Sequence, residues 1–510
     1  MNEAAKPRRR ERANRSAGIR QLPFARLSNP YRPMELLSAD QIESIHQASL
    51  KLLAEIGIEV MHEESRRILR RAGADVDEAT QRVRCDPAMI EAEIAKAPSS
   101  FTILARDPAK SIVLGEGEVV FSSVGGPAFA NDLDRGRRAG HSADMRDYIK
   151  LVQSLNVIHQ EGGGPIEPTD LPAESRHLDF YEAVLTLTDK SWECWALGGY
   201  RVRDAVEMIS IAYGIPRDQM DRQVTAITVI NSNSPLRLDG PMGEGLVELA
   251  RSGQASILTP FTLAGAMSPV TLVGAIIQQN AEALFMVALA QLARPGAAVV
   301  YGGFTSNVDM RSGAPAFGTP EYAKSAMVSG QLARRYGLPF RSSNVTSSNC
   351  VDVQAAYESE MSLWGAVMGG VNLLMHCAGW LEGGLTASFE KLIVDAEMLQ
   401  MMREFLQPLD TSGVEQAMKA VAEVSPGGHF FGVGHTLERY ETAFYAPLLS
   451  DWRNFETWQD SGSLDGTRRA NGIWKELLRS YEEPPMDPAI REALSAYVAR
   501  RKQEIAAGRL

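Results

Sequence analysis

Short apolar runs alternate with amphipathic segments from about residue 116 onward. Each run ends in Gly, Ser or Asn and precedes a segment of helical periodicity, such as ADMRDYIKLVQSL or AIIQQNAEALFMVALAQLA. The runs lie at 119–129, 157–165, 192–199, 224–236, 257–269, 297–309, 340–350 and 372–384. Eight successive β-then-α units predict a (β/α)8 TIM barrel. An open doubly wound sheet is the alternative, but no dinucleotide-binding glycine fingerprint is present, so closure is favoured.

The barrel prediction divides the chain into four parts. We expect the catalytic barrel at 116–405, a helical and short-strand segment at 34–115, and a mainly helical segment at 406–510. Residues 1–33 are basic, since the first 32 hold nine Lys and Arg against two Glu. This composition predicts a disordered tail, and an arm that docks on an acidic protein is the alternative.

The overall composition limits the classes of partner and the compartment that we expect. The 510 residues carry a net charge of −11, which argues against nucleic acid as the main partner. Four cysteines without a CxxC pair favour a reducing compartment. No apolar run appears long enough for a membrane span, and no signal peptide is evident. We therefore expect a cytoplasmic protein without a membrane partner, and a homo-oligomer because symmetric oligomers are common.

The stretch SSNVTSSNC at 342–350 places small polar side chains at the end of the seventh predicted strand. Turns are usually richer in Gly and Pro, and buried strands are usually less polar. Active sites of such barrels lie at the C-terminal ends of the strands. We therefore interpret the stretch as a rim that leaves room for a ligand.

Aromatic side chains recur at these predicted strand ends. They are Phe129, Trp192, Trp195, Phe261, Tyr301, Phe304 and Trp380. The carboxylates there are few, namely Glu161, Glu193, Asp309 and Glu382. Several π faces with some negative charge suit a quaternary ammonium, held by cation–π contacts of roughly 0.5 to 2 kcal/mol each. The alternative is that these aromatics fill core layers or pack helices outside the barrel.

Two histidines complete the titratable set. His159 and Glu161 share a strand face by their spacing of two, as a general acid/base pair would. His376 lies near the end of the eighth predicted strand. Each histidine is as compatible with a hydrogen-bonded structural role as with catalysis.

A thiolate zinc site is a weaker hypothesis. Cys194, Cys350, Cys377 and His376 fall at or near predicted strand ends, but they lack close metal-binding spacing, and we expect no metal. P-loop, GxSxG and corrinoid-binding DxHxxG motifs are absent from the sequence. A carboxylate pair for glycoside hydrolysis, such as Glu161 and Glu382, has no separation fixed by the sequence.

Several long segments resemble the trimethylamine methyltransferase (MttB-like) superfamily. They include VGGPAFANDLDRGRRAGHSADMRDYIKL, EGGGPIEPTD, SNSPL, HCAGWLEGGLTASFEKLIVDAEM, PGGHFFGVGHT and DGTRRANGIWKELLRSYEEPPMDPAIREAL. The resemblance runs from roughly residue 35 to 505. It implies a TIM barrel that passes a methyl group to the Co(I) of a separate corrinoid protein, so the cobalamin would arrive on that partner. No cofactor is then expected on this chain.

The archaeal trimethylamine enzymes carry pyrrolysine, which by the resemblance falls within or close to 342–350. Here every position is an ordinary residue, so the chain is more similar to the non-pyrrolysine glycine betaine:corrinoid methyltransferases. We expect a corrinoid-dependent N-methyltransferase for a small quaternary amine. Glycine betaine is the first choice, followed by proline betaine, carnitine, choline and trimethylamine. A zinc-dependent barrel enzyme and a non-catalytic amine-binding protein are the alternatives.

The expected site follows from this interpretation. Catalysis is expected from His376, Glu161 and His159, and a betaine carboxylate needs donors such as His376, Asn231, Ser347, Ser348 or Asn349. The remaining expected contacts to substrate are Phe129, Trp192, Trp195, Tyr301, Phe304, Trp380 and Glu382. His429 and His435 match the GGHF…HT element of the superfamily and either shape the rim or hold the C-terminal segment.

Overall fold

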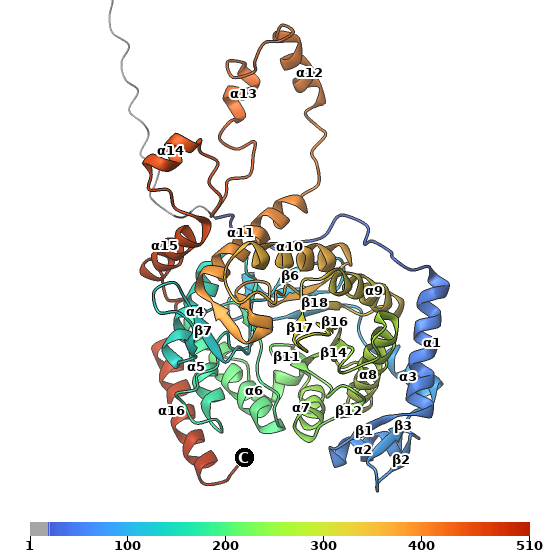
Figure 1. The fold of residues 1–510 in the computed structure, drawn as a ribbon. Coiled ribbons are helices and arrows are strands. Elements are labelled where there is room, and N and C mark those ends of the chain that lie inside the picture. The colour runs from blue at the N-terminus through green and yellow to red at the C-terminus, as the bar shows by residue number, and fades with distance from the viewer. Residues whose placement is uncertain (1–18, 20) are drawn as a thin grey trace, which may run out of the picture.

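The computed structural model describes residue 19 and residues 21–510. Eight parallel strands close into a barrel (Figure 1). In order around the ring they are β6 (Val120–Phe121), β9 (Gln160–Glu161), β10 (Ser191–Trp192), β11 (Ile227–Ile230), β13 (Ala255–Leu258), β15 (Val299–Gly302), β18 (Phe340–Ser343) and β19 (Leu373–Met375). The pairing of β19 with β6 closes the ring, and single bridges join β6 to β9 and β10 to β11. All eight predicted strands are present, so the (β/α)8 fold is confirmed.

One long helix follows each barrel strand and packs outside the ring (Figure 1). These helices are α4 (Ser142–Ser154), α5 (Arg176–Leu187), α6 (Gly199–Tyr213), α7 (Gly240–Arg251), α8 (Leu272–Ala293), α9 (Pro320–Tyr336), α10 (Val353–Met368) and α11 (Phe389–Phe405). Side-chain oxygens of Asp239, Thr319, Asp352 and Ser388 accept first-turn N–H groups. Such caps satisfy N–H groups that the first turn of a helix leaves without partners, so they define where these four helices begin.

A hairpin of β4 (Phe101–Ile103) and β5 (Ile112–Leu114) closes the N-terminal end of the barrel. Its Ile103, Ile112 and Leu114 pack in one buried cluster with inward-facing residues such as Ile257 and Val300. The 3-10 turn Pro108–Lys110 connects the two hairpin strands. Because this end is filled by apolar side chains, only the opposite end can hold a polar ligand.

Short strands form a second tier above the open end. They are β7 (Phe129–Asn131), β8 (Arg138–Ala139), β14 (Phe261–Ala264), β16 (Phe304–Val308), β17 (Pro315–Ala316), β20 (Trp380–Leu381) and β21 (Thr386–Ser388). They make two small sheets, β14-β16-β17 and β20-β21-β7-β8. Each of these strands lies in the loop between a barrel strand and its helix. The second tier therefore brings several predicted aromatic residues to the mouth.

Helix α8 is the one helix in the described part of the chain that is long and apolar enough to cross a membrane. The sequence prediction that no run reaches this length is therefore too strict. However, 78% of the apolar window is buried inside the protein. Its Gln278, Asn280 and Glu282 side chains make internal hydrogen bonds. These contacts identify α8 as a core helix that packs against both the barrel and the N-terminal segment.

The N-terminal segment packs beside the barrel on α8 (Figure 1). It contains α1 (Ala39–Glu55), β1 (Ile58–Val60), α2 (Glu63–Arg71), β2 (Asp75–Asp77), β3 (Arg82–Arg84) and α3 (Pro87–Ile94). Strand β12 (Arg237–Leu238), from the loop after β11, completes its small sheet. Residues 21–33 run against the barrel with Leu27 buried, so this part is not a free tail. Most of the predicted basic tail lies outside the described residues.

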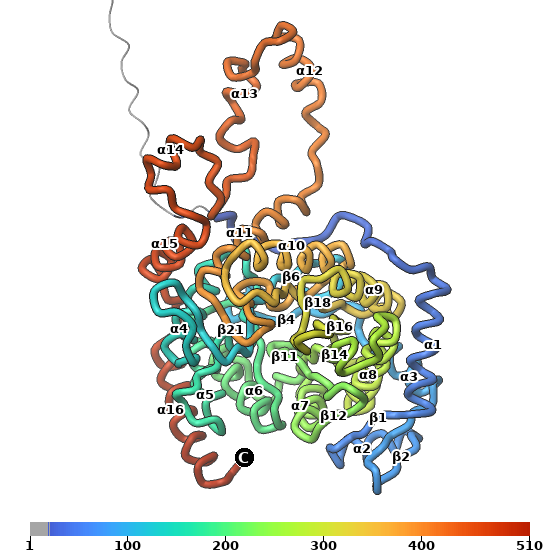
Figure 2. The backbone as a smooth tube through the Cα atoms, viewed as in Figure 1, coloured from blue at the N-terminus to red at the C-terminus, as the bar shows by residue number. Residues whose placement is uncertain are grey.

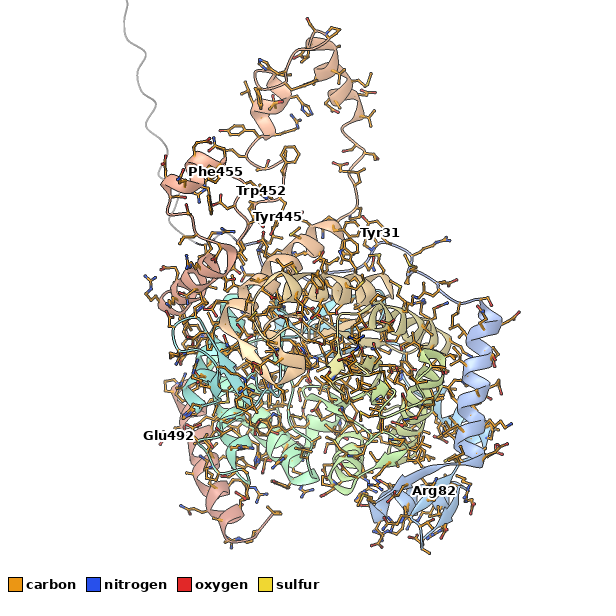
Figure 3. All side chains as sticks on the ribbon, in the orientation of Figure 1. Tyr31, Arg82, Tyr445, Trp452, Phe455 and Glu492 are labelled. Carbon is orange, nitrogen blue, oxygen red and sulfur yellow. The ribbon has the colours of Figure 1, made fainter. Side chains whose placement is uncertain are left out.

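The C-terminal segment is mainly helical. It contains α12 (Val414–Glu423), α13 (Gly434–Arg439), α14 (Phe455–Asp460), α15 (Gly466–Arg479) and α16 (Pro488–Ala506). The arm that carries α12 and α13 projects away from the barrel (Figure 2). Tyr445, at the base of the arm, donates a hydrogen bond to Glu397 of α11 at 3.1 Å (Figure 3). The barrel and the arm therefore meet at α11.

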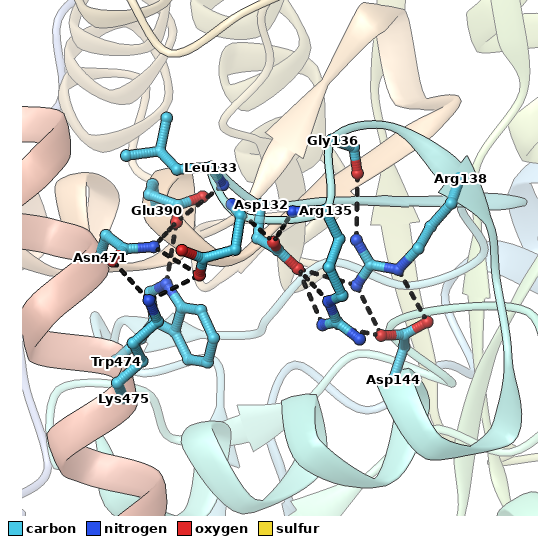
Figure 4. A network of polar contacts seen from close by, with 11 residues as sticks. Asp132, Leu133, Arg135, Gly136, Arg138, Asp144, Glu390, Asn471, Trp474 and Lys475 are labelled. Carbon is cyan, nitrogen blue, oxygen red and sulfur yellow. Dashed lines mark hydrogen bonds and ion pairs between the residues drawn. The ribbon is translucent and has the colours of Figure 1, made fainter.

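A polar network joins α15 to the β7–β8 loop at the mouth (Figure 4). The Glu390 carboxylate accepts hydrogen bonds from Asn471 Nδ2 at 2.8 Å and Trp474 Nε1 at 2.9 Å. The same carboxylate accepts the N–H of Leu133 at 3.2 Å. The C-terminal segment thus helps to fix the loop that lies between the first barrel strand and its helix.

Candidate functional site

A cavity of about 720 Å³ opens at the C-terminal end of the barrel. Its lining comes from the ends of most barrel strands and from the second tier. The lining includes Glu193, Trp195, Asn231, Thr259, Phe261, Phe304, Arg341, His376 and Trp380. A cavity of this size accepts a small organic ligand with room for an approaching second reactant.

An aromatic wall forms one side of the cavity. The ring centroids of Phe261 and Phe304 are 5.2 Å apart, and those of Phe304 and Trp380 are 6.2 Å apart. Phe317 packs behind this wall, 5.5 Å from Phe304. Three predicted contact residues, Phe304, Trp380 and Trp195, do line the cavity. The rings offer several π faces to one ligand volume, as a quaternary ammonium requires.

His376 forms the corner between this wall and the barrel. Its ring centroid lies 4.4 Å from that of Trp380, and Nδ1 lies 3.1 Å from the Ser343 hydroxyl. Burial and the positive charge of Arg341 hold the pKa of His376 well below its usual value. The backbone at His376 is left-handed, with φ of 51°, a strained conformation typical of functional sites. His376 is therefore a neutral imidazole in a fixed position at neutral pH.

Glu193 is a buried carboxyl on the opposite wall. Its Oε1 accepts a hydrogen bond from Ser122 at 3.1 Å, and burial raises its pKa to about 8. The group is thus largely protonated at neutral pH. A neutral carboxylic acid gives the cavity polarity without a full negative charge.

Arg341 is the residue in this cavity that the sequence interpretation missed. It follows Phe340 in β18 and directly precedes the small polar residues at 342–350, which the sequence pattern predicts as the ligand rim. Its side chain is 2% exposed, and Nε donates a hydrogen bond to the Met375 sulfur at 3.0 Å. The register pairs Arg341 with Leu373, which belongs to the inner barrel cluster, so Arg341 also faces inward.

His159 and Glu161 do not reach the cavity. His159 Nδ1 accepts the N–H of Phe121 at 2.9 Å, and Nε2 lies 3.1 Å from the Ala25 carbonyl. Burial lowers the pKa of His159 to about 3, so both nitrogens are satisfied in the neutral ring. Glu161 accepts the N–H groups of Gly163 and Gly164, each at 3.0 Å, and burial raises its pKa to about 8. The structure places both groups in a supporting layer rather than at a ligand.

Four other predicted contact residues also lie outside the cavity lining. Trp192 packs on Phe180 and Tyr181, and Tyr301 donates to Asn280 of α8 at 2.8 Å. The other two, Phe129 and Glu382, both contact Arg137 at the rim. The Arg137 guanidinium carbon lies 3.7 Å from the Phe129 ring centroid, and its Nε donates a hydrogen bond to Glu382 at 2.8 Å. Trp192 and Tyr301 therefore point away from the cavity because of their position in the strand, and Phe129 and Glu382 are occupied by the Arg137 cation.

The polar stretch at 342–350 has a structural function. The Ser347 hydroxyl accepts the N–H of Phe317 at 2.7 Å, and the Thr346 carbonyl accepts Trp380 Nε1 at 3.1 Å. Ser348 donates to Asp352, the N-cap of α10, and Asn349 is exposed. Ser347, Ser348 and Asn349 therefore do not line the cavity, whereas Asn231 does. The stretch positions the aromatic wall rather than touching a ligand.

The cysteines and the remaining histidines are dispersed. Cys194 lines the cavity, Cys377 is buried and Cys350 is exposed. Within residue 19 and residues 21–510, no three His, Cys, Asp or Glu side chains are grouped as metal ligands would be. His429 lies between α12 and α13 and His435 lies in α13, and neither residue lines the cavity.

Comparisons with known proteins agree with this architecture. The family described as trimethylamine methyltransferase (MTTB) matches residues 4–506. The chain is similar to the glycine betaine methyltransferase of Desulfitobacterium hafniense (strain Y51), with 36% identity over 92% of this chain and 98% of that protein. It is also similar to the trimethylamine methyltransferase MttB2 of Methanosarcina mazei, with 27% identity over 91% and 94%. The hydroxylamine complex of MtmB covers 88% of this chain and 90% of its own, with 10% identity and a TM-score of 0.50, a likeness of fold alone.

Proposed function

The chain belongs to the trimethylamine methyltransferase (MTTB) family, and from this premise we propose that it demethylates a small quaternary amine, glycine betaine first. The methyl acceptor is the Co(I) of a separate corrinoid protein in the cytoplasm. The similarity to a glycine betaine methyltransferase over nearly the whole chain supports this choice of substrate. The observation that carries the proposal is the aromatic wall of Phe261, Phe304 and Trp380 in the barrel mouth.

An uncharged aromatic wall suits the change of charge during the reaction. A quaternary nitrogen is positive before transfer and neutral afterwards, because it keeps the electron pair of the broken N–C bond. Cation–π contacts hold the ammonium at roughly 0.5 to 2 kcal/mol each without a neighbouring carboxylate. A full negative charge would stabilise the ground state more than the less charged transition state and slow the transfer. A protonated Glu193 avoids that penalty.

The chain has three tasks in this reaction. The corrinoid of the partner protein would supply the nucleophile, so no side chain of this chain has to attack. The leaving amine is neutral, so no general acid has to protonate it. The cavity must instead bind the amine, orient one methyl toward the open mouth, and exclude water. His376 contributes as a neutral, rigid partner of Trp380.

The direct test is methyl transfer to cob(I)alamin by the purified full-length chain. We expect glycine betaine to convert the Co(I) absorbance to that of methylcobalamin and to yield dimethylglycine by mass spectrometry. Trimethylamine and choline serve as parallel donors. Binding of glycine betaine without any transfer would favour a non-catalytic amine-binding protein. Transfer from trimethylamine alone would assign the chain to the trimethylamine activity of its other relatives.

The aromatic wall has its own test by calorimetry. Trp380→Leu should weaken glycine betaine binding by about 2- to 30-fold, the range of one cation–π contact. Trp364→Leu is the matched control, because Trp364 is half-buried on α10 against Phe405 and does not line the cavity. An equal loss in both variants, or none in Trp380→Leu, would contradict the proposed role of the wall.

A further inference from the structure

Arg341 is a buried cation whose hydrogen-bonding capacity is only partly used. Its Nη1 has no hydrogen-bond partner, and in the described part of the chain no carboxylate forms an ion pair with it. A buried, unpaired charge is expensive and normally finds a partner. Arg341 lines the cavity, where a bound ligand can supply the missing acceptor.

The surrounding charges do not compensate Arg341. Glu167 and Arg176, which also line the cavity, form an ion pair with each other at 2.6 Å. Arg201 adds a further positive charge to the lining. Glu193 is the lining carboxyl that interacts electrostatically with Arg341, but burial outweighs this interaction and raises the pKa of Glu193 to about 8. The pKa of Arg341, lowered to about 10 by burial, leaves the guanidinium charged. The cavity is therefore positive at neutral pH and complements an anionic group.

A second unpartnered polar group lines the same cavity as Arg341, two barrel strands away. Thr259 Oγ1 is buried without a hydrogen-bond partner and lines the same cavity. Gly302 pairs in register with Arg341, and a Cβ on Gly302 would lie 1.7 Å from Thr259 Oγ1. Glycine at 302, on the strand between the two residues, thus leaves space for this hydroxyl. Both residues therefore offer a hydrogen-bond donor without an acceptor from the wall of one cavity, as recognition of a carboxylate requires.

We propose that Arg341, assisted by Thr259, binds the carboxylate of a zwitterionic quaternary amine and makes the chain selective for carboxylated over uncarboxylated amines. The inference rests on the proposed function and specifies its substrate class. The Arg341 guanidinium carbon lies 4.9 Å from the Phe304 ring centroid, so the anion site adjoins the aromatic wall. In a betaine one carbon separates the carboxylate carbon from the nitrogen. A carboxylate on Arg341 therefore leaves the trimethylammonium beside Phe304 and Trp380.

Selectivity follows from the same charges. Choline and trimethylammonium bring a positive charge toward an unpaired guanidinium, and like charges in a buried site repel. A betaine brings its own counter-ion and supplies the hydrogen-bond acceptor that Arg341 lacks. Arginine suits this task because its fork of donors matches a carboxylate, and the Met375 contact fixes its orientation.

The test is calorimetry on the full-length chain with three ligands. Glycine betaine carries both charges, choline lacks the carboxylate, and 3,3-dimethylbutanoate keeps the shape and carboxylate of glycine betaine but lacks the positive nitrogen. We expect wild type to bind glycine betaine more tightly than choline. Arg341→Met should weaken glycine betaine and 3,3-dimethylbutanoate on the order of 100-fold and leave choline unchanged or tighter. Thr259→Val should weaken the two carboxylates several-fold.

Folding controls separate binding from structure. Because Arg341 is an unpaired buried charge, Arg341→Met should keep or raise the thermal unfolding temperature. Arg341→Lys keeps the charge but loses the planar fork and should give intermediate affinity. Arg66→Met is the matched control, since Arg66 is buried in the N-terminal segment and already bonded to Glu78 and the Val60 carbonyl. It should lower stability and leave ligand affinity unchanged.

The outcomes distinguish this inference from the proposed function. Equal weakening of glycine betaine and choline by Arg341→Met, or no weakening of either, overturns the inference and leaves the function intact. Binding of 3,3-dimethylbutanoate alone, lost in Arg341→Met, overturns the quaternary-amine function but retains the carboxylate site. If wild type binds none of the three ligands, both are overturned.

Discussion

The two ends of the barrel each bury a cation, and they treat it differently. At the mouth, Arg341 has one nitrogen without a partner. At the closed end, Lys190 donates to the carbonyls of Val152 at 2.6 Å and Leu155 at 2.8 Å, where α4 ends. Burial lowers the pKa of Lys190 to about 7. Each side chain belongs to a residue only 2% exposed, so burial does not distinguish them.

The difference lies in whether the protein completes the polar contacts itself. The closed end uses helix C-terminal carbonyls, which lack partners of their own and favour positive charge. The mouth leaves Arg341 Nη1 and Thr259 Oγ1 free and holds His376 in a left-handed conformation. All three residues line the cavity, and their combination there is what we interpret as a site kept open for a ligand. Mutations at the two ends should therefore separate stability from binding.

The largest effect on stability is expected from Ile257→Ala at the closed end. Ile257 is fully buried in the cluster that joins the barrel interior to the β4–β5 hairpin. Removing its side chain should lower the free energy of unfolding by about 2–5 kcal/mol, because the cavity cannot collapse inside a closed barrel. Urea denaturation measures this loss. Under native conditions glycine betaine affinity should remain at the wild-type value, and a parallel loss of affinity would contradict the separation of the two ends.

Glu193→Gln, at the mouth, should change how stability depends on pH. The pKa of Glu193 is raised from 4.5 to about 8, so its stabilising contribution is full below pH 4.5 and is lost as the pH rises through 8. Between these values each such carboxyl makes the free energy of unfolding fall by roughly 1 kcal/mol per pH unit. The wild-type protein also contains Glu161, whose pKa is raised in the same direction. The Gln variant should therefore show a shallower decline.

Urea titrations at intervals from pH 5 to pH 8 compare the two proteins. A decline of the same steepness in wild type and Glu193→Gln would mean that Glu193 is ionised in the folded protein. That result would place a negative charge in the cavity and remove the contrast between an unpaired cation at the mouth and a satisfied one below.

Much of the fold was predictable from the sequence. The eight strand ends and their helices follow from apolar runs and helical periodicity, which depend on local composition. The aromatic side of the site was predictable in part, because Phe304 and Trp380 stand at strand ends and do line the cavity. Tyr301 and Trp192 stand there too, yet they face the helices. A shift of one residue along a strand moves a side chain to the opposite face, and the sequence of a short strand does not show which residues face inward.

Arg341 was not predictable for a related reason. An arginine within a predicted strand is normally explained as an edge residue or a helix-facing residue with an exposed head group. Only the register with Leu373 and the closed ring place it inside the barrel. Ser347 and Ser348 illustrate the converse, since their hydrogen bonds to Phe317 and to the N-cap of α10 use groups that composition alone assigns to a ligand. Such contacts depend on the tertiary arrangement of the loops at the barrel mouth, which local sequence patterns do not show.

The smallest effect on ligand binding is expected from Lys190→Met. Lys190 is bonded to two backbone carbonyls at the closed end and does not line the cavity, so the affinity for glycine betaine should stay within about twofold of wild type, as for sites without shared partners. Its effect on stability should have the opposite pH sense to that of Glu193. The pKa of Lys190 is lowered from 10.5 to about 7, so wild type should gain stability as the pH rises from 7 toward 10, and the Met variant should lose this gain. Calorimetry and urea denaturation on the same preparation measure both quantities. A large loss of affinity with unchanged pH dependence would show that the two buried cations belong to one coupled site, and the contrast between the two ends would then fail.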